Sequence, residues 1–270
     1  MDLEELFDKL SPHIPEKIAL DFIELVCEYE NRENQNRMIK INKKIPPAML
    51  RFIVTSRPFA DFFLHSGKIT VENLKESLQK INKNISSFKN ILEFGCGCAR
   101  LAIWFEEDLK NSNYVGTDIN QDAIKWCKEN LNFGTFDVNE PNPPLKYDSE
   151  SFDFIYSYSV FTHLNEEDQK SWLQELHRIT KKDGIVLLTV RGNQDYEKRT
   201  WGEKDIKELN EKGFLFRRSN LWRDIFPDRY QNAYHTKKYI EEKFTKYFKI
   251  LKYIPIGQKK IGQDIVLMKK

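Results

Sequence analysis

The chain has 270 residues and a formal net charge of +2, with 40% hydrophobic and 31% charged residues. This composition is typical of a globular protein, and the length suits one large α/β domain with an appendage, or two small domains. The near-neutral charge argues against a general nucleic-acid binder, and no apolar run approaches the ~18 residues that a membrane span requires.

The N-terminal segment does not resemble a signal peptide, and the cysteines do not suggest a disulfide scaffold. The segment MDLEELFDKL is acidic and amphipathic, whereas a signal peptide has a basic start and an apolar core. We therefore expect a cytoplasmic protein. The chain has four cysteines, too few for a disulfide scaffold at this size. Cys96 and Cys98 form a C-x-C pair with no second ligand pair nearby, so we expect no zinc site and interpret the thiols as small apolar residues.

Residues 1–88 are predicted to form an N-terminal helical cap rather than an independent domain. A first helix is indicated by apolar residues three and four positions apart, and a polar interval follows from Asn31 to Arg37. A short helix is then expected with Pro58 near its start and Gly67 just beyond its end, and another from about Thr70. The apolar face of the first helix contains Ala19, Phe22, Ile23, Val26 and Cys27.

From residue 89 onward, strand and helix patterns alternate. This alternation predicts a Rossmann-like, doubly wound α/β sheet that is mostly parallel, with helices on both faces. Asn120 and Asn165 are expected to cap the second and third of these helices. Two strand-like segments near the end, FKILKYI and QDIVLMK, are expected to pair like a hairpin and to close the sheet with an antiparallel last strand. The five preceding strands are expected at NILEF, NYVGTDI, FGTFDV, FDFIYSYSV and GIVLLTV.

Residues 191–235 interrupt this pattern with many charges and aromatic side chains but no strong periodicity. The segment that follows, Thr236–Lys270, contains ten lysines against three acidic residues. These lysines are interpreted as the solvated faces of a helix and two edge strands, and the alternative is a weak polyanion-binding patch.

Two glycines at the predicted end of the first strand indicate a ligand site. Gly95 and Gly97 let the backbone turn tightly with no side chain between it and a ligand, and the following helix points its free amide groups at the same place. Asp118 ends the second strand, and a carboxylate there suits the two hydroxyls of a ribose. A dinucleotide fingerprint would place a third glycine where this chain has Arg100, which argues against nicotinamide. The alternative is that the glycines only permit helix-on-strand packing and that Asp118 caps a helix.

The segments ILEFGCGCARLA, YVGTDIN, FDFIYSYSVFTHL and LHRITKKDGIVLLTV resemble the successive motifs of the class I methyltransferases that use S-adenosylmethionine. The resemblance covers residues 88–192 well and the closing strands loosely, and it is specific to the cofactor rather than to the substrate. A segment before the first motif, IPPAMLRFIVTSRPFADFFLHSGKIT, is also similar to bacterial methyltransferases of surface polysaccharide synthesis. The class I methyltransferases often have a glycine at the position that Ala99 occupies in this chain.

The resemblance implies a set of cofactor contacts. The methionine part would lie on the backbone of the glycine turn and beside Ser157, its amino group would lie near Glu93, and the ribose would bind Asp118. The adenine would pack on Ile119 and meet Asp137 and the amide of Val138. The implied cofactor-binding residues are therefore Glu93, Gly95, Cys96, Gly97, Asp118, Ile119, Asp137, Val138 and Ser157.

Two histidines are candidate general bases for an oxygen nucleophile. His163 follows the fourth strand, and His235 precedes the helix before the last two strands. The alternative for each is a structural hydrogen bond in a turn.

The 191–235 insertion is expected to wall the acceptor site, with aromatic rings that could stack on a sugar or a base. The alternative is a satellite core under a long loop. Its aromatic residues include Trp201, Phe214, Phe216, Trp222, Phe226, Tyr230 and Tyr234. Its arginines include Arg217, Arg218, Arg223 and Arg229, with Asp224 and Asp228 interleaved.

The sequence therefore predicts an S-adenosylmethionine-dependent methyltransferase for a small-molecule or carbohydrate acceptor, acting at oxygen. The alternatives are an RNA methyltransferase that uses the lysine-rich end, and a non-catalytic module that binds S-adenosylmethionine.

Overall fold

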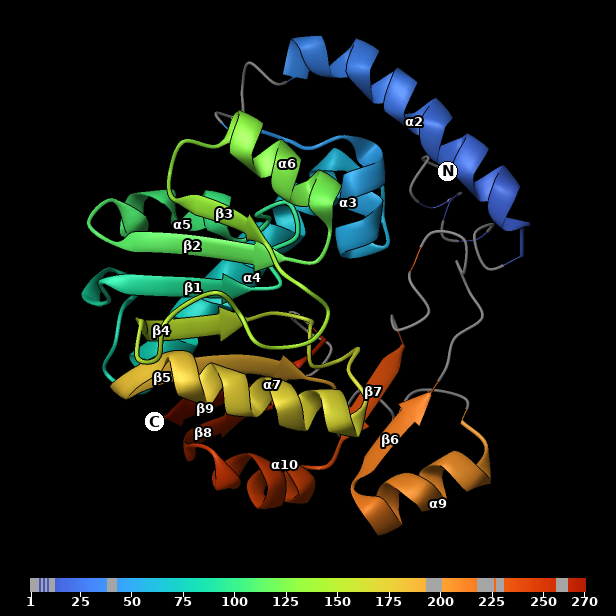
Figure 1. The fold of residues 1–270 in the computed structure, drawn as a ribbon. Coiled ribbons are helices and arrows are strands. Elements are labelled where there is room, and N and C mark those ends of the chain that lie inside the picture. Colours follow the sequence, from blue (N-terminus) through green and yellow to red (C-terminus); the bar gives the residue numbers. More distant parts are fainter. Residues whose placement is uncertain are drawn as a thin grey trace.

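A seven-stranded sheet organises the computed structural model (Figure 1). The structure describes residues 5, 7, 9, 13–37, 43–192, 201–217, 226, 231–255 and 262–270. The strand order is β3-β2-β1-β4-β5-β9-β8, and β1 to β5 are mutually parallel where they pair. The strands are β1 (Asn90–Phe94), β2 (Asn113–Asp118), β3 (Thr135–Val138), β4 (Phe152–Ser157), β5 (Thr180–Val190), β8 (Lys249–Ile254) and β9 (Asp264–Lys269).

The two C-terminal strands close the sheet as predicted. β9 runs antiparallel to β5, and β8 pairs antiparallel with β9 at the sheet edge. β9 therefore lies inside the sheet although it is the last strand in the sequence. The predicted Rossmann-like, mostly parallel sheet with an antiparallel last strand is confirmed. The chain order reverses between β1 and β4, and in such sheets the carboxyl ends at the reversal form a ligand crevice.

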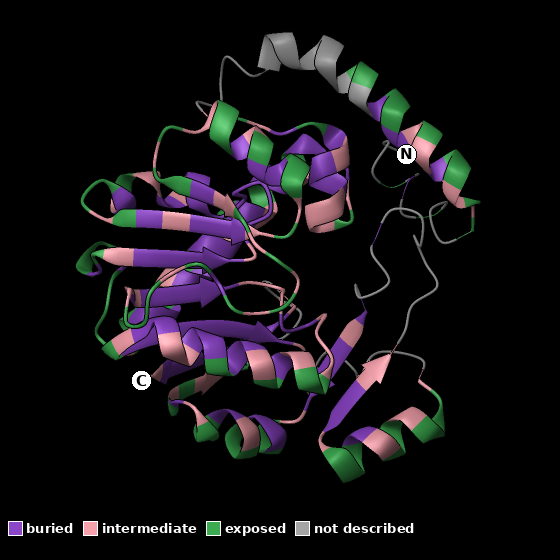
Figure 2. Ribbon diagram, viewed as in Figure 1, coloured by how far each residue is buried: buried purple, intermediate pink, exposed green. Residues whose placement is uncertain are grey.

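Helices cover both faces of the sheet, which explains why its strands are almost continuously apolar. Neighbouring residues of one strand enter opposite layers: Ile91 packs with α4, α5 and α6, whereas Leu92 packs with α7 and α10. Figure 2 shows the central strands β1, β4 and β5 as mostly buried. The helices are α2 (Glu16–Arg37), α3 (Ala48–Thr55), α4 (Ala60–Gln79), α5 (Ala102–Leu109), α6 (Gln121–Asn130), α7 (Glu166–Ile179), α9 (Glu203–Lys212) and α10 (Lys237–Lys243), with 3-10 turns at Ile85–Ser87 and Phe244–Lys246.

The residues before β1 are helical, but two predicted boundaries there are wrong. The helix α2 continues through the polar segment Asn31–Arg37. Gly67 lies inside α4 rather than beyond a helix end, and the Thr70 hydroxyl donates to the carbonyl of Ser66 instead of capping a new helix. The glycine is explained by packing, because a Cβ atom at residue 67 would lie 2.8 Å from the carbonyl oxygen of Arg100. The division into a cap at 1–88 and a domain at 89–270 stays a prediction.

Two further elements differ from expectation. α7 ends at Ile179, and β5 begins at Thr180, four residues before the expected strand GIVLLTV. The insertion contains α9 and a hairpin of β6 (Phe214–Arg217) and β7 (Asn232–His235), which the sequence pattern did not indicate. The expected caps of α6 and α7 are confirmed, because the side chains of Asn120 and Asn165 accept hydrogen bonds from amide groups of the first turn. None of the described helices is long and apolar enough to cross a membrane.

Candidate functional site

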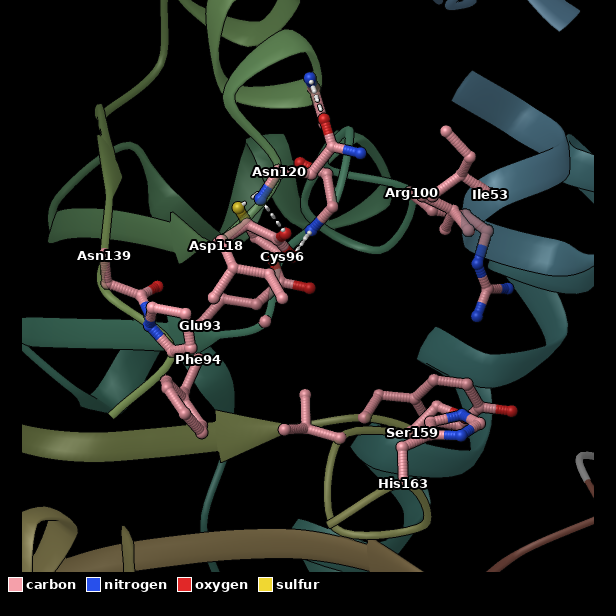
Figure 3. Close-up of a pocket in the computed structure, with 18 of the residues that line it drawn as sticks. Ile53, Glu93, Phe94, Cys96, Arg100, Asp118, Asn120, Asn139, Ser159 and His163 are labelled. Carbon is pink, nitrogen blue, oxygen red and sulfur yellow. Dashed lines mark hydrogen bonds between the residues drawn. The ribbon is translucent and has the colours of Figure 1, made fainter. Parts of the chain in front are cut away.

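A cavity of about 570 Å³ lies at the carboxyl ends of β1, β2 and β4, where the strand order reverses. This volume is in the range of small-molecule sites, about 300–1,000 Å³. Figure 3 shows side chains from both sides of the reversal pointing into it. The lining includes six of the nine predicted cofactor-binding residues, namely Glu93, Gly95, Cys96, Gly97, Asp118 and Ile119.

The loop after β1 presents bare backbone to the cavity. Gly95 and Gly97 have φ angles of 79° and 51°, in the left-handed region that favours glycine. A Cβ atom at Gly95 would collide with Val160, and one at Gly97 would lie 2.7 Å from Val54 Cγ2. Ala99 also has a positive φ, 57°, which explains why glycine would suit this position. The sequence places glycine where the backbone turns and where neighbours leave no room for a side chain.

Asp118 holds this loop in place. Its Oδ2 accepts the amide of Gly97 at 2.7 Å, and its Oδ1 accepts the amide of Asn120 at 2.8 Å. Burial raises the pKa of Asp118, while the amide hydrogen bonds oppose that shift. A carboxylate has about four acceptor positions, so each oxygen retains capacity for a ligand hydroxyl. Asp118 therefore links the glycine loop to the start of α6 and still faces the cavity.

Glu93 is a buried acid at the floor of the site. Its Oε2 accepts the hydroxyls of Tyr114 at 2.5 Å and Tyr156 at 2.8 Å. Burial raises the pKa of Glu93 to about 7, against the lowering effect of these two hydrogen bonds and of Arg100. Among the described residues, none donates to its Oε1. The residue can therefore switch between a neutral acid and an anion near neutral pH.

Cys96 and Ile119 lie at the same loop ends with different exposure. The Cys96 thiol is buried, and burial raises its pKa well above the usual value, so the free thiol is a poor nucleophile. Ile119 is 43% exposed and offers an apolar face beside Asp118. The described residues contain no group of three metal-ligating side chains.

Three predicted cofactor residues lie outside the cavity lining, and their roles stay predictions. Asp137 forms an ion pair with Lys146 at 2.8 Å and accepts the hydroxyl of Tyr147 at 3.0 Å. Val138 is exposed beside it, and Ser157 is buried at the end of β4. From the β3 side, Asn139 lines the cavity instead. The sequence interpretation did not name Asn139, which comes directly after β3 and belongs to no motif that it used.

The two candidate histidines occupy different environments. His163 lines the cavity, and its Nδ1 lies 2.6 Å from the carbonyl oxygen of Gln231, which requires Nδ1 to donate. His235 is fully buried in β7 outside the lining, with Nε2 3.0 Å from Gln169 Oε1. Burial lowers the pKa of both to about 3. Both imidazoles are therefore neutral and act in structural hydrogen bonds, and a catalytic role stays a prediction for each.

Among the described residues of the insertion, one aromatic ring reaches the cavity. Phe226 lines it and stacks on Phe52 of α3, with ring centroids 5.8 Å apart. The rings of Trp201 and Tyr234 instead pack among α9, β6 and β7, and Phe214 packs on His235 and on Tyr239 of α10. Phe216 is a half-buried neighbour of the α7 layer, and Arg217 pairs with Asp205. The predicted positions that lie outside the described residues are Trp222, Tyr230, Arg218, Arg223 and Arg229.

Helix α3 and Arg100 complete the cavity, and the sequence interpretation did not assign them to it. Leu50, Ile53 and Val54 of α3 form an apolar wall opposite the strand ends, and Arg100 lies beside Tyr158. The only sequence signal for Arg100 was its place in the motif, where a dinucleotide site would have glycine. The apolar residues of α3 carried no signal because any amphipathic helix has such a face.

The lysine-rich end does not form an unbroken basic surface among the described residues. On α10, Lys237 and Lys238 pair with Glu241 and Glu242 one turn later. Lys243, Lys269 and Lys270 pair with acids of other elements. Such exposed pairs add little stability, but they reduce the local positive potential. The solvated-face interpretation is favoured over a polyanion patch.

Comparisons with known proteins agree with this geometry. Residues 91–184 match the family model of a methyltransferase domain. A curated relative, malonyl-[acyl-carrier protein] O-methyltransferase 2 of Ilyobacter polytropus, is 32% identical over 113 residues, which are 40% of this chain and 41% of that protein. TehB of Haemophilus influenzae, named as a probable S-adenosyl-L-methionine-dependent methyltransferase, is 29% identical over 142 residues. These are 50% of this chain and 46% of that protein. The chain thus spans less than half the length of these curated relatives.

Solved structures share the fold. Magnesium protoporphyrin IX methyltransferase from Synechocystis PCC 6803 superimposes with a TM-score of 0.52 at 16% identity, over 92% of this chain and 99% of that one. A structure from Listeria monocytogenes, named as a putative S-adenosylmethionine-dependent methyltransferase, superimposes with a TM-score of 0.55 at 13% identity. The match covers 76% of this chain and 99% of that one. At such identities the likeness concerns the fold alone.

Proposed function

The chain carries a domain of the class I, S-adenosylmethionine-dependent methyltransferases, and from this premise we propose that the protein methylates a small-molecule or carbohydrate acceptor at an oxygen atom. One observation carries the proposal. A single cavity joins the glycine loop and Asp118 to an apolar wall from α3. It therefore has a polar half suited to a nucleoside and an apolar half suited to an acceptor.

The residues of the polar half fit the cofactor. The backbone of Gly95 and Gly97, which lines the cavity, would lie against the methionine part. The spare acceptor capacity of Asp118 would take the ribose hydroxyls, and Ile119 would cover one face of the adenine. The free Oε1 position of Glu93 would accept from the amino group. When bound, S-adenosylmethionine supplies a methyl group already activated on a sulfonium.

The chain's own contribution to the reaction would be positioning and exclusion of water. An acceptor oxygen must lie in line with the methyl group, about 3 Å away, in a site shielded from solvent. Leu50, Ile53, Val54 and Phe226 provide such shielding. His163 is a weak base because its pKa is about 3, so we assign it to holding Gln231 rather than to proton removal.

Methylation at oxygen is supported by a relative. The curated protein from Ilyobacter polytropus is named as an O-methyltransferase. The near-neutral charge and the paired lysines of the C-terminal segment favour a small acceptor over RNA.

Isothermal titration with S-adenosylhomocysteine tests the cofactor site. We expect micromolar binding by the wild-type protein and at least tenfold weaker binding by Asp118→Ala, since that change removes the ribose acceptor and releases Gly97. Asp21→Ala, at an exposed position of α2, is the matched control and should bind like the wild type. Absence of binding heat in the wild-type protein would contradict the proposal.

A second assay separates an enzyme from a non-catalytic binding module. Cell extract freed of macromolecules is incubated with the protein and S-adenosylmethionine that carries a labelled methyl group. We expect label in small-molecule products with the wild-type protein and a loss of it with Asp118→Ala. Tight binding without any labelled product would support the non-catalytic module instead.

A further inference from the structure

Arg100 is a cation in the wall of the cavity. It is 7% exposed and comes directly after the glycine loop. Figure 3 shows its side chain beside Ile53, on the other side of the cavity from Asp118 and Asn139. The guanidinium therefore lies on the side of the cavity that α3 lines.

The guanidinium has few partners of its own. Its Nη1 donates to Ser66 Oγ at 3.2 Å, and its central carbon lies 5.1 Å from the centre of the Tyr158 ring. Among the described residues no carboxylate oxygen lies within 4.0 Å of it. Glu93 is near enough to interact electrostatically, but its Oε2 already accepts from two tyrosines. A guanidinium has five N–H donors, so most of them remain available at the edge of the group.

We infer that Arg100 is the recognition site for a carboxylate on the methyl acceptor, an inference that rests on the proposed function and specifies its substrate class. A buried cation without an ion partner is costly, and an anionic substrate would remove that cost. Ser66 and the Tyr158 ring fix the plane of the guanidinium. Its edge can then donate two parallel hydrogen bonds to the two oxygens of one carboxylate.

The charges of the cavity favour a carboxylate over a phosphate. Glu93 and Asp118 line the same cavity, so a dianion would be repelled, whereas one arginine neutralises a monoanion. The apolar neighbours Leu50, Ile53 and Val54 suit a hydrocarbon or aromatic body attached to that carboxylate. We therefore expect an acid with an apolar body rather than a free sugar.

The test uses the full-length protein saturated with S-adenosylhomocysteine and a panel of acids from propionate to 3-phenylpropionate, each matched by its uncharged amide. Binding is followed by ligand-observed nuclear magnetic resonance. Arg100→Met keeps the length and apolar stem of the side chain, and Arg100→Lys keeps the charge without the planar fork. Arg57→Met is the control, because Arg57 also stacks on a ring, Phe62, but lies outside the cavity lining. Thermal unfolding of each variant verifies that it folds.

We expect the wild type and Arg57→Met to bind at least one acid tenfold more tightly than its amide. Arg100→Met should lose this preference, Arg100→Lys should retain part of it, and all four should bind S-adenosylhomocysteine within twofold of one another. Equal binding of every acid and amide, or no binding of either, overturns the inference while the proposed function stands. A tenfold loss of S-adenosylhomocysteine binding in Arg100→Met would assign the arginine to the cofactor carboxylate and also overturn it. Failure of the wild type to bind S-adenosylhomocysteine would contradict the proposed function itself.

Discussion

Glu93 is a buried acid whose protonation is set by its surroundings. It is buried between two tyrosine hydroxyls, and its pKa of about 7 lies above the ordinary value of 4.5 because burial disfavours the anion. Between pH 4.5 and 7 the folded protein therefore keeps a proton that the unfolded chain has lost. Unfolding then becomes easier as the pH rises through this window.

The substitution Glu93→Gln should remove this pH dependence, since an amide resembles the protonated acid and does not titrate. We expect the free energy of unfolding of the variant, minus that of the wild type, to increase from pH 4.5 to 7 by at most roughly 3 kcal/mol. Urea unfolding at half-unit pH steps measures this difference. Glu72→Gln, at an exposed position of α4, gives the baseline. A difference that stays constant with pH would show that Glu93 titrates normally.

At the scale of elements, the packing of α4 on the glycine loop shows where sequence patterns are informative and where they are not. Strand and helix alternation predicted the sheet because its strands are buried on both faces. Gly95, Gly97 and Asp118 were predictable because a turn at a strand end needs special residues. Gly67 was misread because a glycine that permits close packing looks the same as one that ends a helix. The cavity walls from Ile53 and Arg100 depend on contacts between distant segments, which local patterns do not encode.

Replacing Gly67 by alanine tests this close packing. Alanine is the better helix former by about 1 kcal/mol, but its Cβ would lie 2.8 Å from the Arg100 carbonyl oxygen and 3.0 Å from Trp104 Nε1. We expect a net destabilisation of about 1–3 kcal/mol by overpacking, measured by urea unfolding. Glu72→Ala on the exposed face of the same helix should change stability by less than about 0.5 kcal/mol. A more stable Gly67→Ala variant would mean that α4 can move away from the loop.

At the scale of the whole molecule, two neutral histidines connect β7 and the residue before it to the sheet layers. His163 donates to Gln231, and His235 in β7 contacts Gln169 of α7. The pKa of each is lowered to about 3 by burial. Below the ordinary value of 6.5 the unfolded chain binds protons that the folded chain does not. Stability is therefore present above pH 6.5 and decreases as the pH falls toward 3.

The double variant His163→Asn, His235→Gln tests this acid sensitivity. Asn and Gln place a donor near Nδ1 and Nε2, respectively, and neither titrates. As the pH falls from 6.5 to 4, the free energy of unfolding of the wild type should decrease relative to that of the double variant. The decrease should be up to about 1.4 kcal/mol per pH unit for each histidine. The half-buried His163 should contribute the smaller share. Urea unfolding at each pH gives the comparison. Parallel pH profiles of the two proteins would contradict the assignment.

The position of β9 has a consequence for biosynthesis. β5 and β8 do not pair with each other, since β9 lies between them. A nascent chain would therefore expose the edge of β5 until residues 264–269 leave the ribosome, and an exposed strand edge is a site of aggregation. Closure of this half of the sheet therefore waits until residues 264–269 are available to pair with both β5 and β8.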